Sequence, residues 1–495
     1  MKKSIFTFCL AVMAVVALHA ESYSGNIVVN FDGQVYNADV TVTVTPEADG
    51  LNTFSLEVPI LGTLVMNDVH CDTQGGVTVY SAQRDVDVVY NSSTIVMNTI
   101  LFARTVDGMM AANVSIPAYG IDLWFNTVGN HFQLPNSDME AWTNSNGEPD
   151  RWHGFKTAGG SFASTSAGLV KLEQSNDVRS GATGHSAVMT ANSAFGIVAN
   201  GTMTNGRLMA GSMFATDTKN HAEMDKANGT DDFYMPLYAK PDKFNVWLKY
   251  TQGTTNANNK ANVSVKTFDG TYYQEPKDKE YTNLSGSIVG GQIPAGDWTH
   301  YSFDFDYESY AANGAASEAI FVTFSTNGNP GQGSKNDALY VDDMELVYLG
   351  NMTDLRYKGQ TISGWNPAVM AYEMEIDGEP NLDDFTATIE GVSAVLTKSM
   401  EKNQDGSYRI AISVVAADLQ TAACYIITTK APAPQFLPGA VNNDGSVNIS
   451  DVTALIDILL ASNSDISNPA ADVNQDGSVN ISDVTALIDM LLTSN

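Results

Sequence analysis

Short runs in which apolar and polar residues alternate fill the N-terminal part of the chain. Residues 40–45 read Val-Thr-Val-Thr-Val-Thr, and glycine-containing pairs such as Asp49-Gly50 and Asp107-Gly108 separate the runs. A period of two is typical of a strand with one buried face, and such pairs favour tight hairpin turns. About eight strands of ordinary length fit into residues 21–130. The pattern therefore predicts an antiparallel β-barrel, which leaves no sheet edge exposed.

The middle of the chain stays rich in predicted strands but has longer polar connections. Long surface loops are predicted at 216–230 and 251–260. No helical period is present, so residues 131–350 predict a two-sheet sandwich of the jelly-roll type. Its clearest strands are expected at Phe244–Tyr250, Ala261–Phe268, Trp298–Tyr307 and Ala319–Ser325.

A third β-rich segment follows at residues 351–430. Its length and turn spacing predict a small immunoglobulin-like sandwich. Strands are expected at Thr386–Glu390, Tyr408–Val415 and Tyr425–Thr429. Residues 431–438 contain Ala-Pro-Ala-Pro and are predicted to form an extended Pro-rich linker.

The C-terminal region contains an internal duplication. Residues 442–460 recur as 474–492 with two differences, Asn443/Gln475 and Ile458/Met490. Each copy joins an oxygen-rich loop to an amphipathic helix. In the second copy the spacing i, i+3, i+4, i+7 predicts a buried stripe made of Val484, Leu487, Ile488 and Leu491.

The loop of the second copy has the ligand spacing of an EF-hand-like calcium loop. A glycine, Gly477, stands at position 6, where the chain must turn sharply. The oxygen ligands at positions 1, 3, 5, 7, 9 and 12 would be Asp472, Asn474, Asp476, Ser478 through its carbonyl, Asn480 and Asp483. Without a cation the three carboxylates would repel one another, which disfavours the alternative of two metal-free acidic turns.

The first copy lacks one ligand. Ala440 occupies position 1, and the remaining candidates are Asn442, Asp444, Ser446, Asn448 and Asp451. Because calcium affinity follows the number and charge of the ligands, the sequence predicts one firm and one weak calcium site.

Two departures from a complete EF-hand are informative. Position 12 carries Asp instead of Glu, and no helix precedes the loop. In both respects residues 439–495 closely resemble a type I dockerin, a calcium-binding module that docks onto cohesin domains. The resemblance implies a cohesin-like partner, read by Ile449, Ser450, Ile481 and Ser482.

Two other segments also resemble known families. The opening Tyr23-Ser24-Gly25-Asn26, the Leu61-Gly62 step and the closing residues 121–125 resemble the calycin-like barrels of secreted Bacteroidetes proteins. Residues 134–142 and 339–346 resemble the opening and the closing strand of carbohydrate-binding jelly rolls. The whole region resembles the family called "Putative carbohydrate metabolism domain". This second resemblance implies a structural calcium ion held by Glu140 and by Asp342 or Asp343, with ordinary surface carboxylates as the alternative.

Sugar recognition needs flat aromatic faces together with polar groups that bond hydroxyls. Aromatic residues in or beside polar loops could supply such a platform, although core packing remains the alternative for each of them. These candidates are Trp142, Trp152, Tyr272 and Tyr273, whereas Trp247 and Trp298 lie in predicted strands and are assigned to the core.

A catalytic pair is a weaker hypothesis. Asp304 and Asp306 lie on one face of a predicted strand, about 7 Å apart, which is within the range for an inverting glycosidase. Such carboxylates normally come from different strands, so a solvated strand face explains the two residues better. No catalytic residue is assigned.

Charge and export signals narrow the function further. The chain has 25 Lys and Arg against 56 Asp and Glu, a net charge of −31, which excludes nucleic acid as a partner and favours divalent cations. Residues 1–20 have the basic start, apolar run and small final residue of a signal peptide, so a secreted product, periplasmic, at the cell surface or extracellular, is expected. No other apolar run is long enough for a transmembrane segment.

The sequence thus predicts a mostly β, multi-domain, calcium-binding protein with a small α-helical dockerin. We expect it to bind a polysaccharide or host glycan and to attach to a cohesin-like partner. The alternative is a glycoside hydrolase of polysaccharide catabolism with catalytic carboxylates in the jelly roll, and a purely structural surface protein is a third hypothesis. Whether the barrel holds a ligand stays open.

Overall fold

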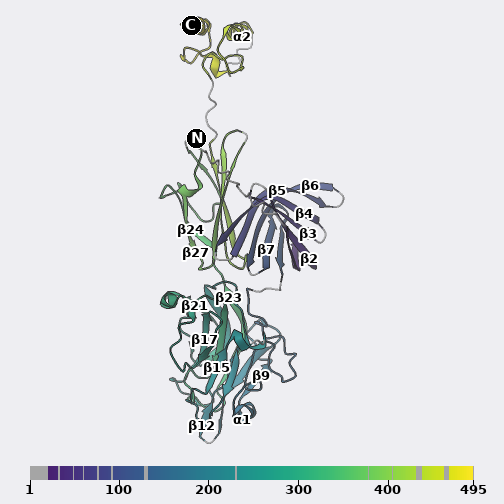
Figure 1. Cartoon of the computed structure of the whole chain (residues 1–495), viewed down its shortest axis with the longest axis vertical. Coiled ribbons are helices and arrows are strands. Elements are labelled where there is room, and N and C mark those ends of the chain that lie inside the picture. Colours follow the sequence, from purple (N-terminus) through teal and green to yellow (C-terminus); the bar gives the residue numbers. More distant parts are fainter. Residues whose placement is uncertain are drawn as a thin grey trace, which may run out of the picture. The chain divides into compact units, whose positions relative to one another are not determined.

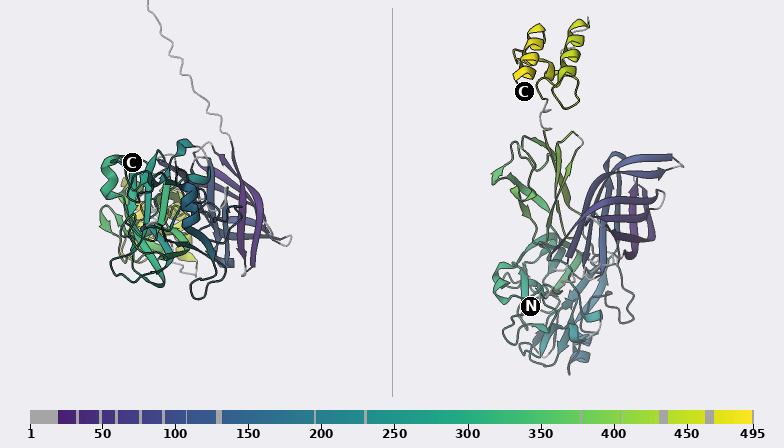
Figure 2. Two further views of the ribbon diagram at one scale, coloured as in Figure 1. Left: turned by 90° about the horizontal axis from the view of Figure 1, so that it is seen from below. Right: turned by 45° about the horizontal axis from the view of Figure 1, so that its top comes forward.

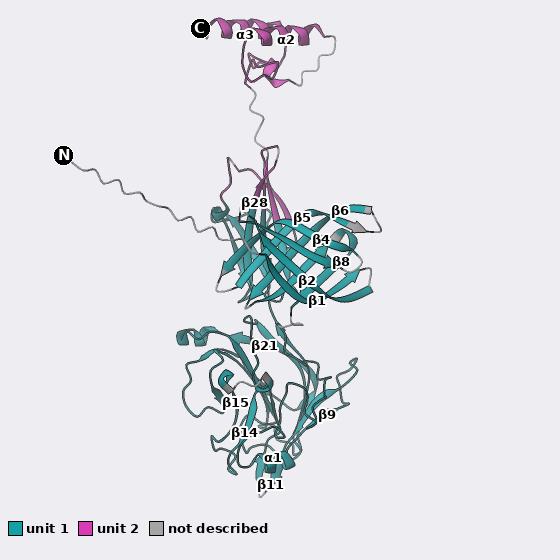
Figure 3. Cartoon of the chain, turned by 45° about the vertical axis from the view of Figure 1, so that its right-hand side comes forward, with its two compact units in different colours: residues 1–370, 382–399, 411–425 teal, residues 371–381, 400–410, 426–495 magenta. Residues whose placement is uncertain are grey.

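The computed structural model describes most of the chain. The described ranges are 20–31, 34–47, 50–58, 61–74, 77–90, 93–106, 108–127, 132–194, 196–228, 231–376, 378–403, 405–430, 437–461 and 468–493. The predicted signal peptide, apart from its last residue, and most of the predicted linker lie outside these ranges. The chain divides into two compact units, one made of residues 1–370, 382–399 and 411–425, the other of 371–381, 400–410 and 426–495 (Figure 3).

The N-terminal region is a closed barrel in which every strand pairs with its neighbour in sequence and β8 pairs with β1 (Figure 1). Apolar side chains from all eight strands form one core, with Ile27, Phe54 and Phe125 fully buried. The predicted antiparallel barrel is confirmed. Its strands are β1 (Glu21–Phe31), β2 (Gln34–Pro46), β3 (Asn52–Val58), β4 (Gly62–Gln74), β5 (Val77–Tyr90), β6 (Ser93–Val106), β7 (Met109–Ile116) and β8 (Ile121–Asn126).

The central region is built on one long antiparallel sheet with the order β13-β22-β17-β19-β21-β16-β23-β10-β9. The four strands predicted here are all present. β21 pairs with β16 along most of its length and with β19 at its end. The two sheets predicted from the sequence are therefore joined through β21. The strands are β9 (Lys171–Ser175), β10 (Ser186–Thr190), β13 (Thr202–Thr204), β16 (Lys243–Thr251), β17 (Ala261–Phe268), β19 (Leu284–Ile288), β21 (Gly296–Asp306), β22 (Ala319–Ser325) and β23 (Ala338–Val347).

Smaller elements of the central region were not predicted. Helix α1 (Ala163–Leu169) and the hairpin β11 (Asn192–Ala194) and β12 (Ile197–Ala199) are short. A three-stranded sheet is formed by β14 (Arg207–Ala210), β15 (Asn220–Met224) and β18 (Tyr273–Glu275). The prediction of a continuous loop over 216–230 is wrong, because β15 interrupts it. This strand lacks β-branched residues and is held by pairing with β14 and β18.

The third region contains a three-stranded sheet, β25-β24-β27, and a four-stranded sheet, β26-β30-β29-β28. The three predicted strands are present, and β26 adds a parallel pairing with β30. The immunoglobulin-like assignment stays a prediction. The strands are β24 (Asn351–Tyr357), β25 (Gln360–Thr361), β26 (Ala371–Met374), β27 (Phe385–Glu390), β28 (Val395–Lys402), β29 (Tyr408–Val415) and β30 (Ala422–Thr429).

The C-terminal region is helical, as predicted. α2 (Ile449–Leu460) and α3 (Ile481–Thr493) pack through a small core that includes Val452, Leu455, Val484 and Leu487. The predicted stripe is only partly buried, because Ile488 is 39% exposed. None of the helices in the described residues is both long and apolar enough to cross a membrane.

Candidate functional site

The two C-terminal loops have nearly the same backbone conformation. Asn443 and Gln475 adopt positive φ angles of 64° and 58°, and Gly445 and Gly477 follow at 81° and 83°. Two left-handed residues within three positions produce the sharp turn of a calcium loop, and glycine occupies the second without strain. The difference between the loops therefore lies in their ligands and not in their backbone.

The carboxylate at position 12 is fixed in the same way in both loops. Asp451 accepts hydrogen bonds from the backbone N–H groups of Asn442 and Asn448, both at 2.9 Å. Asp483 accepts from those of Asn474 and Asn480, at 3.1 and 2.9 Å. Both carboxylates are fully buried, so each closes its loop onto the following helix. In the first copy Asn448 also caps α2 through Ser450 N–H.

The second loop has one more oriented carboxylate than the first. Asp472 accepts from the N–H groups of Asp476 and Gly477 at 3.1 and 2.9 Å, whereas Ala440 at the equivalent place is 5% exposed and has no side-chain oxygen. Hard oxygen donors already oriented by the backbone fit a calcium ion. Among the described residues, no group of three or more His, Cys, Asp or Glu side chains is arranged around one metal position.

The outer faces of both C-terminal helices expose large apolar side chains. The two helices lie side by side (Figure 2). Ile449 and Leu460 on α2 are 71% and 77% exposed, and Ile481 and Leu492 on α3 are 70% and 71% exposed. The duplication thus repeats the same exposed pair on each helix. Ile449 and Ile481, which the sequence analysis assigned to partner recognition, lie at the first turns of these helices.

A cleft of about 500 Å³ opens in the central region. Its lining comes from α1, the hairpin β11–β12, the three-stranded sheet and the strands β17 and β22. Apolar side chains such as Leu169, Ile197 and Met209 alternate there with polar ones such as Ser264 and Thr323. Mixed linings of this kind are typical of small-molecule and sugar sites.

The acidic group in the cleft is fully bonded. Glu275 accepts from Ser264 Oγ at 2.6 Å and from the Tyr273 hydroxyl at 2.8 Å. Lys266 Nζ lies 3.7 Å from Glu275 Oε1, the oxygen that also accepts from Tyr273. Of the described residues that line the cleft, Glu275 is the single carboxylate and Lys277 the single lysine.

The loop 211–219 carries two exposed apolar residues at the cleft. Met213, which lines the cleft, is 55% exposed, and the adjacent Phe214 is 65% exposed. Asn220 Nδ2 donates to the Phe214 carbonyl at 2.8 Å, so the loop tip is held against the start of β15. Phe214 is not among the aromatic residues predicted from the sequence, although an apolar pair inside an otherwise polar loop is a usable signal.

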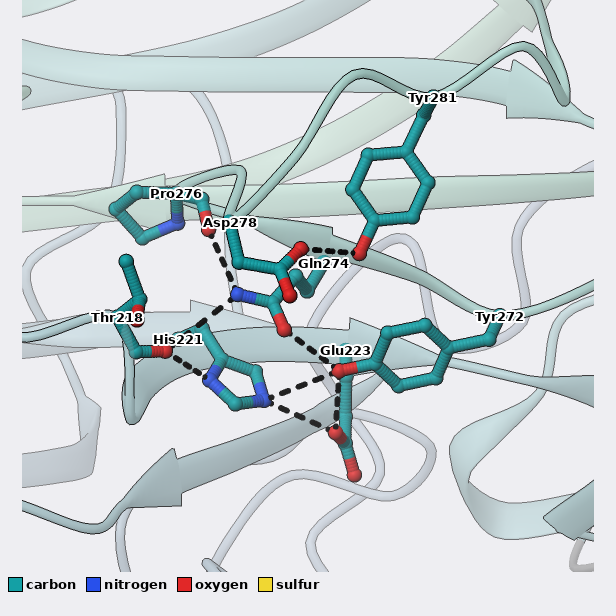
Figure 4. A network of polar contacts seen from close by, with 8 residues as sticks. All are labelled: Thr218, His221, Glu223, Tyr272, Gln274, Pro276, Asp278 and Tyr281. Atoms are coloured by element: carbon teal, nitrogen blue, oxygen red, sulfur yellow. Dashed lines mark hydrogen bonds and ion pairs between the residues drawn. The ribbon is translucent and has the colours of Figure 1, made fainter.

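A polar network holds the far end of this loop (Figure 4). His221 Nδ1 lies 2.8 Å from the Thr218 carbonyl and Nε2 lies 3.0 Å from Glu223 Oε2. Both partners are acceptors, so both bonds form together only when the ring is an imidazolium. The Tyr272 hydroxyl donates to Gln274 Oε1 at 2.7 Å and lies 3.3 Å from the same Glu223 oxygen. The network ties the loop to β15 and to the segment around β18.

The hydrogen bond from His221 holds the pKa of Glu223 below its usual value. A carboxylate with a depressed pKa adds stability above its unfolded pKa of about 4.3 and loses that contribution as the pH falls through the depressed value. Glu223→Gln is therefore expected to lower the calorimetric unfolding temperature at pH 7 and to lower it less at pH 3. The exposed Glu280 offers a matched control, since Glu280→Gln should be neutral at both pH values. An equal effect of Glu223→Gln at both pH values would show that the ionised form of Glu223 does not stabilise the fold.

The structure brings together two of the three carboxylates predicted to hold calcium in the central region. Asp342 is 3% exposed, and burial together with the negative charges of Asp343 and Glu140 raises its pKa to about 7. Glu140 Oε1 accepts from His185 N–H at 2.7 Å. Asp343 is instead neutralised by Arg179, whose Nη2 lies 2.7 Å away. Glu140 is thus near enough to Asp342 for its negative charge to act on that carboxyl group, and the calcium site itself stays a prediction.

The prediction of an exposed aromatic platform is wrong for two of the four residues. Trp152 is fully buried, packs 6.1 Å from Phe324 and donates its indole N–H to the Pro135 carbonyl. Tyr273 is also fully buried and bonds Glu275. Trp142 and Tyr272 are half-buried.

The assignment of Trp247 and Trp298 to the core is also wrong. Both are half-buried on the outer face of the long sheet. Trp298 Nε1 donates to Asp177 at 2.9 Å, and the Arg179 guanidinium lies 5.0 Å over the Trp247 ring.

The two aspartates considered for catalysis lie apart from the cleft lining. Asp304 pairs with Lys243 at 2.6 Å, and Asp306 accepts from Ser309 N–H at 2.9 Å. These contacts agree with a solvated strand face.

Two family models match the chain. Residues 438–492 match the Dockerin type I domain, and residues 122–347 match the Putative carbohydrate metabolism domain. The C-terminal region is a type I dockerin and the central region is a carbohydrate metabolism domain of this family, as predicted. The second match begins within β8 of the barrel. The search of curated proteins found no match.

Solved structures give distant similarities. One is the M60 catalytic domain with the CBM51-1 and CBM51-2 domains from Clostridium perfringens ZmpB, at 10% identity and a TM-score of 0.17, covering 87% of this chain and 40% of that one. Another is the N-terminal CBM22-1-CBM22-2 tandem domain from Paenibacillus barcinonensis Xyn10C, at 11% identity and a TM-score of 0.20, covering 66% and 92%. The chain thus spans 40% of the length of the first of these proteins.

Proposed function

We propose that this protein is a secreted, non-catalytic glycan-binding protein. Its central cleft binds a polysaccharide or host glycan, and its dockerin attaches it to a cohesin-like partner in the periplasm, at the cell surface or outside the cell. The two family matches support the carbohydrate-related and attachment parts of this function. A signal peptide over residues 1–20 would supply the export route.

The observation that carries the proposal is the chemistry of the cleft. Hydroxyl and amide side chains stand among apolar ones, as sugar recognition requires. The exposed Phe214 ring at the adjoining loop adds a flat apolar face for the C–H groups of a pyranose. Tyr272 and Trp142 remain half-buried candidates for secondary contacts.

Hydrolysis is less well supported than binding. A glycosidase of the usual type needs two carboxyl groups on either side of the scissile bond. Glu275 is the one carboxylate among the described lining residues; it accepts hydrogen bonds from two hydroxyl groups and forms an ion pair with Lys266. This arrangement favours a binding site in which Glu275 orients neighbouring hydroxyl groups.

Calcium has two proposed roles. In the dockerin it would be bound firmly by Asp472, Asn474, Asp476, Asn480, Asp483 and the Ser478 carbonyl, and weakly by the first loop. In the central domain we propose a structural ion held by Glu140 and Asp342. Asp343 is left out of this set because its charge is already balanced by Arg179.

Phe214→Ala should weaken glycan binding about tenfold, because a stacked aromatic ring contributes on the order of 1 kcal/mol. The measurement is affinity electrophoresis or calorimetry of the full chain on a glycan panel, with released reducing sugar assayed in parallel. Val289, an exposed apolar residue of the same domain outside the cleft lining, provides the control Val289→Ala. Product release by the wild type would favour the hydrolase, and unchanged binding by Phe214→Ala would place the site elsewhere.

A further inference from the structure

We infer that the central cleft selects uncharged glycans that carry N-acetyl groups. The inference rests on the proposed glycan-binding function and adds the class of sugar. It follows from three features of the cleft: its charge balance, its apolar walls and an amide donor that the protein leaves unbonded.

The charge balance excludes strongly charged sugars. The described lining contains one carboxylate, one lysine and one histidine, and Glu275 is bonded by Ser264, Tyr273 and Lys266. An amino sugar would therefore find no unpaired carboxylate there. A uronate or sulfate would find one lysine, Lys277, because both ring nitrogens of His221 already contact the Thr218 carbonyl and Glu223, and the net charge of the whole chain is −31. An uncharged ligand does not have to bury a charge without a partner of opposite sign.

The apolar walls favour a ligand with methyl groups. Leu169 on α1, Ile197 on β12 and Met209 on β14 bring branched and flexible side chains into the lining from three elements. A plain hexose presents hydroxyl groups around its ring, and burying one of them unbonded costs about 1–3 kcal/mol. Burying a methyl group instead gains about 0.8 kcal/mol. The methyl end of an acetamido group matches such walls.

The third feature is the side chain of Asn327, which lines the cleft and is 5% exposed. Its Oδ1 accepts from Asn329 N–H at 2.9 Å, which fixes the orientation of the amide. Its Nδ2 has no hydrogen-bond partner among the described residues. An amide donor that stands unbonded in the lining of the cleft can donate to a strong acceptor, such as the carbonyl oxygen of an acetamido group.

A second amide near Asn327 repeats the arrangement. Asn262 Oδ1 accepts from Gln292 Nε2 at 2.7 Å, so its NH₂ group is also the end left for a ligand. A Cβ placed on Gly328, next to Asn327, would lie 3.4 Å from Cβ of Asn262, so the two segments are close. Asn200, whose Nδ2 donates to the Asn327 carbonyl at 3.3 Å, also lines the cleft and has a buried Oδ1 without a hydrogen-bond partner. An acetamido group offers a carbonyl oxygen to the amide donors and an N–H to this acceptor.

The test compares three oligosaccharides of the same β-1,4 linkage by calorimetry on the full chain: chitohexaose, cellohexaose and the fully deacetylated glucosamine hexamer. We expect chitohexaose to bind at least about tenfold more tightly than the other two. Asn327→Leu should lower the affinity for chitohexaose about tenfold and that for cellohexaose clearly less, so that most of the preference is lost. Asn262→Leu is the second variant in case the first does not fold.

The possible outcomes test the preference for N-acetyl groups separately from the glycan-binding function. Equal affinity for chitohexaose and cellohexaose, or stronger binding of the deacetylated hexamer, would overturn the inference and leave the glycan-binding function intact. The absence of binding to these three and to a broad neutral and acidic glycan panel would overturn the proposed function itself.

Discussion

Asp476→Ala should lower the affinity of the full chain for calcium about 100-fold, whereas Asp444→Ala should affect only a weak second binding event. The two residues occupy the same position in loops with the same backbone angles. In the second loop the proposed ligand Asp476 acts with Asp472 and Asp483, and a bound calcium ion would relieve the repulsion between these three carboxylates. The first loop holds only Asp444 and Asp451, because Ala440 replaces the ligand at position 1.

The measurement is isothermal titration of calcium into chelator-treated full-length protein. Asp489 is a matched control, since Asp489→Ala removes the same charge from the exposed face of α3 outside the loop and should change the affinity less than about twofold. Any heat that disappears in Glu140→Gln belongs to the proposed ion of the central domain. If Asp476→Ala and Asp444→Ala lowered the calcium affinity equally, the two loops would be equivalent. That result would contradict the prediction made from the number of ligands in each loop.

The parts of the fold that the sequence predicts well are those with local periodicity. Alternation with a period of two predicts the barrel strands and the long strands β16 and β17, in which buried and less buried positions alternate. β22 is instead a short apolar run that is buried at four consecutive positions. The duplication predicts α2, α3 and both loops. In these segments the local pattern and the tertiary environment favour the same structure.

The parts that the sequence does not predict depend on contacts between distant segments. β15 is five residues long and exists because β14 and β18 pair with it. Once this strand is known, the spacing of His221 and Glu223 puts both side chains on one face, which explains their contact. The sequence pattern predicts a loop over both residues and therefore gives no sign of the network.

The candidate sugar site shows the same limit. Trp142 and Trp152 both stand in polar, turn-rich sequence, yet the first is half-buried and the second fully buried. Phe214 stands in similar sequence and is 65% exposed. Local composition does not distinguish these three rings, because their exposure depends on which distant segments pack against them.

Trp152→Ala should destabilise the central domain by about 3–5 kcal/mol, which is the usual cost of truncating a large buried aromatic side chain. The substitution removes the packing of the indole against Phe324 and the hydrogen bond from its N–H to the Pro135 carbonyl. It also leaves that carbonyl without this donor, which adds to the loss. Trp152→Phe keeps much of the ring volume and should cost clearly less.

Trp142→Ala is the matched comparison, because Trp142 lies in the same opening segment but is only half-buried. We expect its unfolding midpoint in urea to shift by less than half of the shift for Trp152→Ala, because less apolar surface returns to water. Glycan affinity, measured on folded protein well below the midpoint, should be nearly unchanged for Trp152→Ala. A stable Trp152→Ala variant that no longer binds glycan would instead restore Trp152 to the binding platform and contradict its role as the centre of the core.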